Sequence, residues 1–170
     1  MSSEEPLTIL FEEADRRRPC PSFRLDSVQG RPVSLTDYRG ADNLILYFAH
    51  NLACTHCREV LRHFEISQFD FRREGAIVLA VFPEPVQSLR GEGFLLGLHF
   101  PVLADPSGKT RSDYVNLMAN ELVLEADALL FVLDNYGCPY SALVSKEADG
   151  ESFRRAALPW LSYISMQCPE

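Results

Sequence analysis

The run Phe48-Ala49-His50-Asn51-Leu52-Ala53-Cys54-Thr55-His56-Cys57-Arg58-Glu59 carries a Cys-x-x-Cys motif. It begins at the end of the continuous apolar stretch 44–48, which is typical of a strand covered on both faces. Beyond the motif, apolar Val60, Leu61 and Phe64 recur at helical spacing. The sequence therefore predicts that both cysteines lie where a buried strand passes into the start of a helix.

The start of a helix is a chemically distinctive place for a cysteine. The first backbone N–H groups lack partners within the helix, and together with the helix dipole they stabilise a thiolate. We expect Cys54, at or just before the first turn, to have the more exposed sulfur and to attack. Cys57 lies about one turn further and can close a short ring with Cys54, which suits reversible dithiol/disulfide chemistry. A protonated His56 inside the motif would stabilise the thiolate further.

The segments on either side of the motif alternate between strands and helices. We expect a β-hairpin over 23–35, strands at 44–48, 76–82, 100–103 and 128–133, a second hairpin into 140–145, and helices from the Cys-x-x-Cys motif to residue 71 and at 85–97, 109–118 and 159–166. This order predicts an α/β fold with a central mixed β-sheet flanked by helices. The sequence contains no repeat and no linker, so we expect a single domain over 1–170.

The balance of charges narrows the classes of function. The 170 residues include 16 Lys+Arg and 24 Asp+Glu, which gives a formal net charge of -8. Binding to nucleic acid or to an anionic membrane surface needs concentrated positive charge, so we expect neither partner. The first six residues carry acids, and no stretch reaches the roughly 18 apolar residues of a membrane span. We therefore expect no export signal and no membrane anchor.

The number of cysteines indicates a reducing compartment. There are five, Cys20, Cys54, Cys57, Cys138 and Cys168, and an odd number without an export signal favours free thiols in the cytoplasm over a disulfide framework. Cys20 lies between two prolines with no helix to activate it, so we interpret it as a bystander. Cys138 follows a turn and Cys168 lies in the tail. A tail thiol could resolve a distant sulfenic acid, although incidental roles are the simpler interpretation for both.

Two other interpretations of the Cys-x-x-Cys motif remain open. The cysteines could be inert core residues, because free cysteine is often buried. They could also bind zinc together with His50 and with His63 or His99. A structural zinc site usually brings a second pair of ligands, however, and the sequence has no second Cys-x-x-Cys. We therefore expect neither a metal ion nor a bound cofactor.

Three residues in or near the motif could assist the two cysteines, namely His50, His56 and Arg58. His50 in the loop could polarise the thiols, although a loop histidine is commonly just solvated. Arg58 directly follows the motif, and we hypothesise that it supplies positive charge to the site. Glu59 and His63 are four residues apart on the predicted helix, so we expect them to form a surface pair.

Landmarks spread along the chain resemble one protein family. They are Pro21-Ser22-Phe23-Arg24-Leu25, the stretch 30–40, the strand 44–48 with Cys54-x-x-Cys57-Arg58, and the stretches 100–108 and 131–137. In this order, from about Pro21 to Gly137, they resemble the alkyl hydroperoxide reductase/thiol-specific antioxidant (redoxin, peroxiredoxin-like) family. The resemblance implies a thioredoxin-like fold with an N-terminal β-hairpin extension. It also implies redox chemistry at the junction of strand and helix.

The motifs of the two branches of this family predict different cysteines as the attacking residue. Peroxiredoxins carry Pro-x-x-x-Thr/Ser-x-x-Cys, which aligned from Phe48 without gaps places Cys57 at the peroxidatic position. Dithiol oxidoreductases carry Trp-Cys-x-x-Cys, in which the first cysteine, here Cys54, attacks. Exposure at the start of the helix favours Cys54. Three residues before Phe131, where peroxiredoxins often have an arginine and dithiol enzymes a cis-proline, the chain has Ala128, so we expect slower peroxide reduction.

Together these patterns predict a thiol-dependent oxidoreductase of the peroxiredoxin-like type. Cys54 and Cys57 would cycle between dithiol and disulfide while reducing a peroxide, and an external thiol reductant such as a thioredoxin or glutathione system would restore them. One alternative is a thioredoxin-like enzyme that acts on protein disulfides. Another is a non-catalytic redox-sensing or binding module of the same fold.

Overall fold

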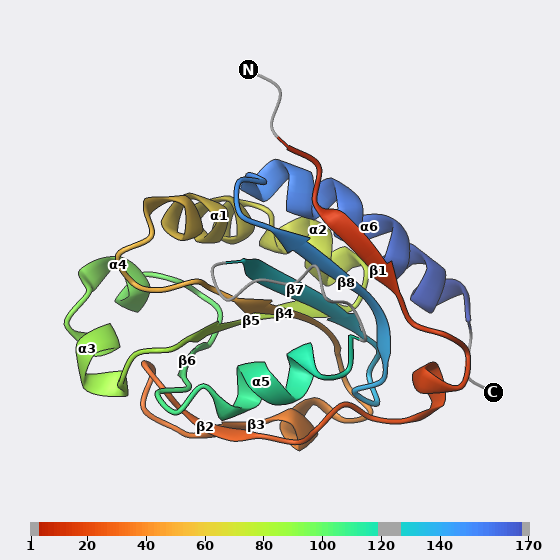
Figure 1. Ribbon diagram of the computed structural model, residues 1–170, viewed down its shortest axis with the longest axis horizontal. Coiled ribbons are helices and arrows are strands. Elements are labelled where there is room, and N and C mark those ends of the chain that lie inside the picture. Colours follow the sequence, from red (N-terminus) through yellow and green to blue (C-terminus); the bar gives the residue numbers. More distant parts are fainter. Residues whose placement is uncertain (1–3, 119–126, 168–170) are drawn as a thin grey trace.

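The computed structural model describes residues 4–118 and 127–167 (Figure 1). The strands are β1 (Leu7–Leu10), β2 (Arg24–Ser27), β3 (Val33–Ser34), β4 (Asn43–Phe48), β5 (Ala76–Phe82), β6 (Val102–Ala104), β7 (Ala128–Leu133) and β8 (Pro139–Ser145). The α-helices are α1 (Thr55–Ile66), α2 (Gln68–Arg73), α3 (Val86–Arg90), α4 (Gly93–Leu96), α5 (Lys109–Val115) and α6 (Gly150–Met166). Short 3-10 helices occupy Asp15–Arg17 and Leu35–Tyr38.

The described strands form one sheet in the order β1-β8-β7-β4-β5-β6-β2-β3. The central pairs β4–β5 and β5–β6 are parallel, and the other neighbouring pairs are antiparallel. The predicted mixed sheet is therefore confirmed. The N-terminal hairpin of β2 and β3 is confirmed as well, and it extends the sheet beyond β6. Strand β4, the two helices after it and β5 make the expected parallel βαβ unit.

Strand β4 is apolar along its length because both faces of the sheet are covered. Ile45 and Tyr47 pack beneath α1, α2 and α6, whereas Leu44, Leu46 and Phe48 lie on the opposite face with α5 (Figure 1). All five side chains are buried, and each contributes roughly 1.5–3 kcal/mol of hydrophobic stabilisation. Packing on both faces fixes the direction of the strand, and with it the point at which the chain leaves the sheet.

Two predicted helices are interrupted in the structure. The helix predicted from the motif to residue 71 starts at Thr55, directly after Cys54 as expected, and breaks at Ser67 into α1 and α2. The helix predicted over 85–97 breaks around Gly91 into α3 and α4. In both cases each part contributes buried apolar residues to the same core, so the periodicity of the buried positions continues across the break. The predicted helix over 109–118 is also shorter and ends at Val115.

The last helix starts earlier than predicted. It begins at Gly150, and the Asp149 side chain caps it by accepting the Ser152 N–H at 2.8 Å. Pro159 suggests a helix start because proline favours the first turn, yet it lies inside α6. None of the helices in residues 4–118 and 127–167 is long and apolar enough to span a lipid bilayer.

Strand β1 is absent from the sequence-based prediction. It pairs with β8 from Leu7 opposite Val144 to Leu10 opposite Ser141, at the edge of the sheet. Three of its four residues are exposed, so no buried alternation marks it in the sequence.

Candidate active site

The Cys-x-x-Cys motif lies at the carboxyl end of β4, as the sequence predicts. The chain leaves the strand at Phe48 and enters α1 at Thr55. Cys54 is the N-cap residue of that helix, and its sulfur accepts the Cys57 backbone N–H, with 3.2 Å between nitrogen and sulfur. The Cys54 side chain is only partly buried. A sulfur in this position meets solvent while a helix N–H group stabilises negative charge on it.

Cys57 lies in the first turn of α1 and is buried in the core. Its side chain is 1% exposed, and its sulfur accepts the His50 backbone N–H at 3.3 Å. Burial raises the pKa of Cys57 to about 11, and the hydrogen bond with Cys54 adds to this effect. The His50 N–H and the Tyr47 hydroxyl lower the same pKa by a smaller amount. Cys57 is therefore a protonated thiol at neutral pH.

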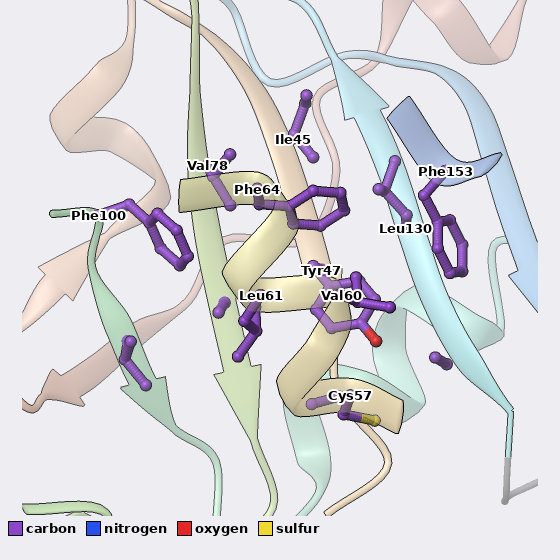
Figure 2. Packing of buried hydrophobic residues seen from close by; sticks show 14 of the residues in the cluster. Ile45, Tyr47, Cys57, Val60, Leu61, Phe64, Val78, Phe100, Leu130 and Phe153 are labelled. Carbon is purple, nitrogen blue, oxygen red and sulfur yellow. The ribbon is translucent and has the colours of Figure 1, made fainter. Parts of the chain in front are cut away.

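The Tyr47 hydroxyl is a part of the site that sequence reasoning missed. Tyr47 is fully buried in β4, and its hydroxyl points toward the Cys57 sulfur (Figure 2). Edge-on contacts with Phe64 and Phe153, at centroid distances of 5.5 and 5.8 Å, hold the ring in place. The hydroxyl makes no hydrogen bond within bonding distance among the described residues, and the Cys57 sulfur is the polar group that it faces. Burial raises the pKa of Tyr47 well above its usual value, so the hydroxyl stays protonated and can donate to sulfur.

Two charged side chains hold the loop between β4 and Cys54. Leu52 donates its backbone N–H to Glu84 Oε1 at 2.6 Å, and its carbonyl accepts the Arg58 Nε–H at 3.2 Å. The Arg58 guanidinium also forms an ion pair with Glu92 at 3.4 Å. These contacts make Arg58 an anchor of the loop, in addition to the charge that we hypothesise from the sequence. Glu84 gives no signal in the sequence, because its partner is a backbone N–H group on a distant loop.

The sequence suggests that the side chains of His50 and His56 act on the thiols, but the structure shows other contacts. His50 acts on Cys57 through its backbone N–H, and its imidazole is exposed. The His56 Nε2 lies 2.6 Å from the carbonyl oxygen of Ala148, in the loop before α6. The ring of His56 thus links the start of α1 to that loop.

The predicted surface pair of Glu59 and His63 is wrong. Glu59 binds Arg62 at 2.5 Å, and His63 Nε2 lies 2.9 Å from Glu151 on α6. Helix α6 approaches α1 so closely that a Cβ atom on Gly150 would lie 2.3 Å from the Cβ atom of His63, which explains the choice of partner. In the part of the chain that the structure describes, no group of three or more His, Cys, Asp and Glu residues could hold a metal ion. The zinc interpretation therefore has no ligand set there.

The sequence matches the model of one known protein family over most of its length. The sequence model of the AhpC/TSA family matches residues 17–142, which include the whole motif. The chain belongs to the AhpC/TSA family. Two curated Mycobacterium tuberculosis proteins, from strains CDC 1551 and H37Rv, carry peroxiredoxin names and are each 34% identical over 86 residues. The match covers 51% of this AhpC/TSA chain and 54% of each relative, so the chain spans about half the length of the curated relatives that it matches.

Solved structures confirm the thioredoxin-like fold of this AhpC/TSA chain. Peroxidoxin BcpB from Mycobacterium tuberculosis matches with a TM-score of 0.72 at 18% identity, over 86% of this chain and 96% of that one. The bacterioferritin comigratory protein of Xanthomonas campestris matches with a TM-score of 0.70 at 19% identity, over 95% and 99% of the two chains. Both similarities extend well beyond the motif, so the whole sheet and its helices follow the expected architecture.

A guanidinium group approaches β7 of this AhpC/TSA chain from α5. Ala128 stands where peroxiredoxins often have an arginine, and the residue before it accepts a hydrogen bond from Arg111, with 2.7 Å between the guanidinium nitrogen and the Asp127 carbonyl oxygen. The charge of Arg111 also lowers the pKa of Tyr47, against the larger effect of burial. Sequence reasoning considered Arg58 and the residues next to Ala128 as sources of positive charge. It missed Arg111, which reaches β7 from α5, a distant part of the chain.

Two of the remaining cysteines, Cys20 and Cys138, lie away from this site. Cys20 and Cys138 are buried free thiols near the end of β7, away from the carboxyl end of β4. Cys168 lies outside the described residues, so its role in the tail stays a prediction.

Proposed function

We propose that the chain is a thiol-dependent peroxidase in which Cys54 attacks the peroxide and Cys57 resolves the product. The observation that best supports these roles is the difference between the two sulfurs. Cys54 is partly exposed at the N-cap of α1, whereas Cys57 is 1% exposed. An attacking sulfur has to meet the peroxide, while a resolving sulfur has to meet only the first sulfur. Membership of the AhpC/TSA family and the peroxiredoxin names of the curated relatives support a peroxide as substrate.

In the first step the Cys54 thiolate attacks one oxygen of the peroxide. A sulfur–oxygen bond forms, the O–O bond breaks, and the departing hydroxide or alkoxide takes up a proton to give water or an alcohol. Cys54 is oxidised by two electrons to a sulfenic acid. The Cys57 N–H, which lies 3.2 Å from the Cys54 sulfur, stabilises the thiolate before this attack.

In the second step the Cys57 sulfur attacks the Cys54 sulfur. The disulfide bond forms, the sulfur–oxygen bond breaks, and the hydroxyl leaves as water with the Cys57 proton. Because the pKa of Cys57 is raised to about 11, this proton leaves during the step itself. The His50 N–H and the Tyr47 hydroxyl donate to the sulfur while negative charge develops on it. An external thiol reductant, such as a thioredoxin or glutathione system, then returns two electrons, a cycle suited to a reducing cytoplasm.

The rate at which hydrogen peroxide oxidises the reduced protein tests this proposal. We expect a second-order rate constant far above that of free cysteine, and a loss of about 100-fold or more in Cys54→Ser. Serine is a good N-cap residue, so this variant removes the thiolate while retaining the start of α1. Cys57→Ser should keep the fast first oxidation but stop at the sulfenic acid, which a dimedone adduct detected by mass spectrometry would reveal.

Two outcomes contradict the proposal in different ways. If Cys57→Ser abolishes the fast oxidation and Cys54→Ser does not, the roles of the two sulfurs are reversed. If the reduced wild type reacts no faster than free cysteine, the chain is not a peroxidase.

A further inference from the structure

Two cysteines outside the proposed site come from distant parts of the chain and lie side by side. Cys20 donates its backbone N–H to the carbonyl of Gly137, with 2.8 Å between nitrogen and oxygen, and Cys138 is the next residue along the chain. The geometry of such a hydrogen bond sets the Cα atoms of the two cysteines about 4–6.5 Å apart. Disulfides usually have a Cα separation of about 4.4–6.8 Å, so the backbone places the two cysteines in a range that overlaps the one a disulfide needs.

Both thiols of this pair are buried. The Cys20 and Cys138 side chains are 4% and 6% exposed, and both are free. Burial raises the pKa of Cys20, and Cys138 and then Asp134 add to the effect. For Cys138, burial and then Asp134 raise the pKa to about 11. Each thiol thus lies within electrostatic range of the same carboxylate, and Cys20 also lies within electrostatic range of Cys138.

Cys20 and Cys138 are separated from the Cys-x-x-Cys motif by about the length of strand β4. Leu133, which ends β7 just before the turn with Cys138, pairs with Leu44 at the start of β4. The motif follows Phe48 at the other end of β4. At about 3.3 Å per residue the intervening strand spans roughly 13 Å, and the loop before Cys54 adds to this distance. Direct exchange between the two pairs within one chain would therefore need a large rearrangement.

We propose that Cys20 and Cys138 form a second, slowly oxidised disulfide that fastens the segment between β1 and β2 to the turn between β7 and β8. With hydrogen peroxide as oxidant, one sulfur attacks the O–O bond as a thiolate and becomes a sulfenic acid, and the departing hydroxide takes a proton to give water. The other sulfur then displaces the hydroxyl as a second water and forms the S–S bond. Two thiols lose two electrons and two protons, and one peroxide becomes two waters.

The segment that this bond would fasten already contacts the turn and its neighbours through weak interactions. The Phe11 N–H donates to the Tyr140 carbonyl at 3.4 Å, and the Tyr114 hydroxyl donates to the Pro21 carbonyl at 3.0 Å. The Arg16 guanidinium lies over the ring of Tyr140, 5.2 Å from its centroid. A disulfide would turn this set of reversible contacts into a covalent closure of the chain from residue 20 to residue 138.

A full-length variant that keeps only these two cysteines tests the inference. Cys54→Ser, Cys57→Ser and Cys168→Ser are combined, so the result does not depend on the proposed peroxidase function. After prolonged exposure to excess hydrogen peroxide we expect the loss of two free thiols per chain. Peptide mapping should show Cys20 linked to Cys138 within one chain. The melting temperature should rise by about 5 °C or more, because the bond restricts the unfolded chain, and dithiothreitol should reverse the rise.

The matched control adds Cys20→Ser to that variant and should show neither the linked peptide nor the rise in melting temperature. The inference is wrong if both cysteines are still alkylated after oxidation and unfolding, if they are oxidised separately to sulfinic acids, or if they link different chains. If the triple substitution does not fold by circular dichroism, peptide mapping of the oxidised wild type decides between the same outcomes.

Discussion

Two pairs of cysteines lie toward opposite ends of β4 and differ in the features that govern thiol reactivity. Cys54 and Cys57 lie at the start of α1, where a backbone N–H group points at each sulfur. Cys20 and Cys138 lie between an extended segment and a turn, nearly fully buried and close to the negative charge of Asp134. In both places two cysteines are neighbours, and we propose a disulfide for each pair. The surrounding backbone and charges decide how fast it forms.

The largest expected difference between the pairs is in alkylation of the folded, reduced protein. Iodoacetamide at neutral pH should modify Cys54 about 100-fold faster than Cys20 or Cys138, since only Cys54 combines exposure with stabilisation by a helix N–H group. Mass spectrometry of peptides from a time course measures the individual rates. In denaturant the rates should become similar, and similar rates in the folded protein would remove the contrast between the pairs.

A second test measures how the burial of Cys57 affects the stability of the protein at alkaline pH. Burial raises the pKa of Cys57 from 9.0 to about 11 in the folded protein. The pKa of Cys57 is higher in the folded protein than in the unfolded one. The contribution of Cys57 to the free energy of unfolding is therefore complete below pH 9 and is lost as the pH rises toward 11. The loss amounts to about 2 kcal/mol for this group.

Urea unfolding of the reduced protein at about pH 8 and about pH 10.5 measures this loss. The free energy of unfolding should fall by about 2 kcal/mol more in the wild type than in Cys57→Ala. Equal losses in the two proteins would show that Cys57 is not shielded from solvent as the structure indicates.

Tyr47 offers a smaller and more specific way to test the reactive pair. Tyr47→Phe should slow disulfide formation after the first oxidation by about 10-fold, because the developing charge on Cys57 loses a hydrogen-bond donor. The matched control is Tyr114→Phe, which removes a buried hydroxyl that binds the Pro21 carbonyl instead. Stopped-flow fluorescence after one equivalent of peroxide measures the step. Equal slowing in both variants would indicate a general packing effect.

The smallest expected effect concerns the anchoring of the active-site loop. Arg58→Ala should lower the rate of peroxide consumption by about 3-fold, since the Leu52 carbonyl loses its partner and the loop before Cys54 becomes less ordered. Glu92→Gln breaks only the partly exposed ion pair of Arg58, which contributes little, and should change the rate by less than about 2-fold. A large effect of Arg58→Ala, of about 100-fold, would instead support a direct action of its charge on the substrate.

The junction that carries Cys54 and Cys57 is predictable because its signals are local. An apolar run covered on both faces, a loop and an amphipathic helix each leave a pattern within a few residues, and the structure places all three as expected. The thioredoxin-like fold follows from landmarks in fixed order along the chain. Edge strand β1 leaves no such pattern, because three of its four residues face solvent.

The parts of the site that could not be predicted depend on contacts between distant segments. Tyr47 resembles any other core residue of an apolar strand until the position of Cys57 relative to its hydroxyl is known. Glu84 binds a backbone group, which has no sequence signature. His63 takes Glu151 rather than Glu59 as its partner because α6 crosses α1 at that point.

The position of Cys54 at the N-cap of α1 has an evolutionary consequence. Serine fills the same capping position at least as well as cysteine does, so an exchange at residue 54 would remove the sulfur that we propose attacks the peroxide without removing the start of the helix. Loss of activity and loss of fold are therefore separable in a lineage that descends from this chain. Descendants with serine at this position would persist as folded domains, free to be selected for binding alone.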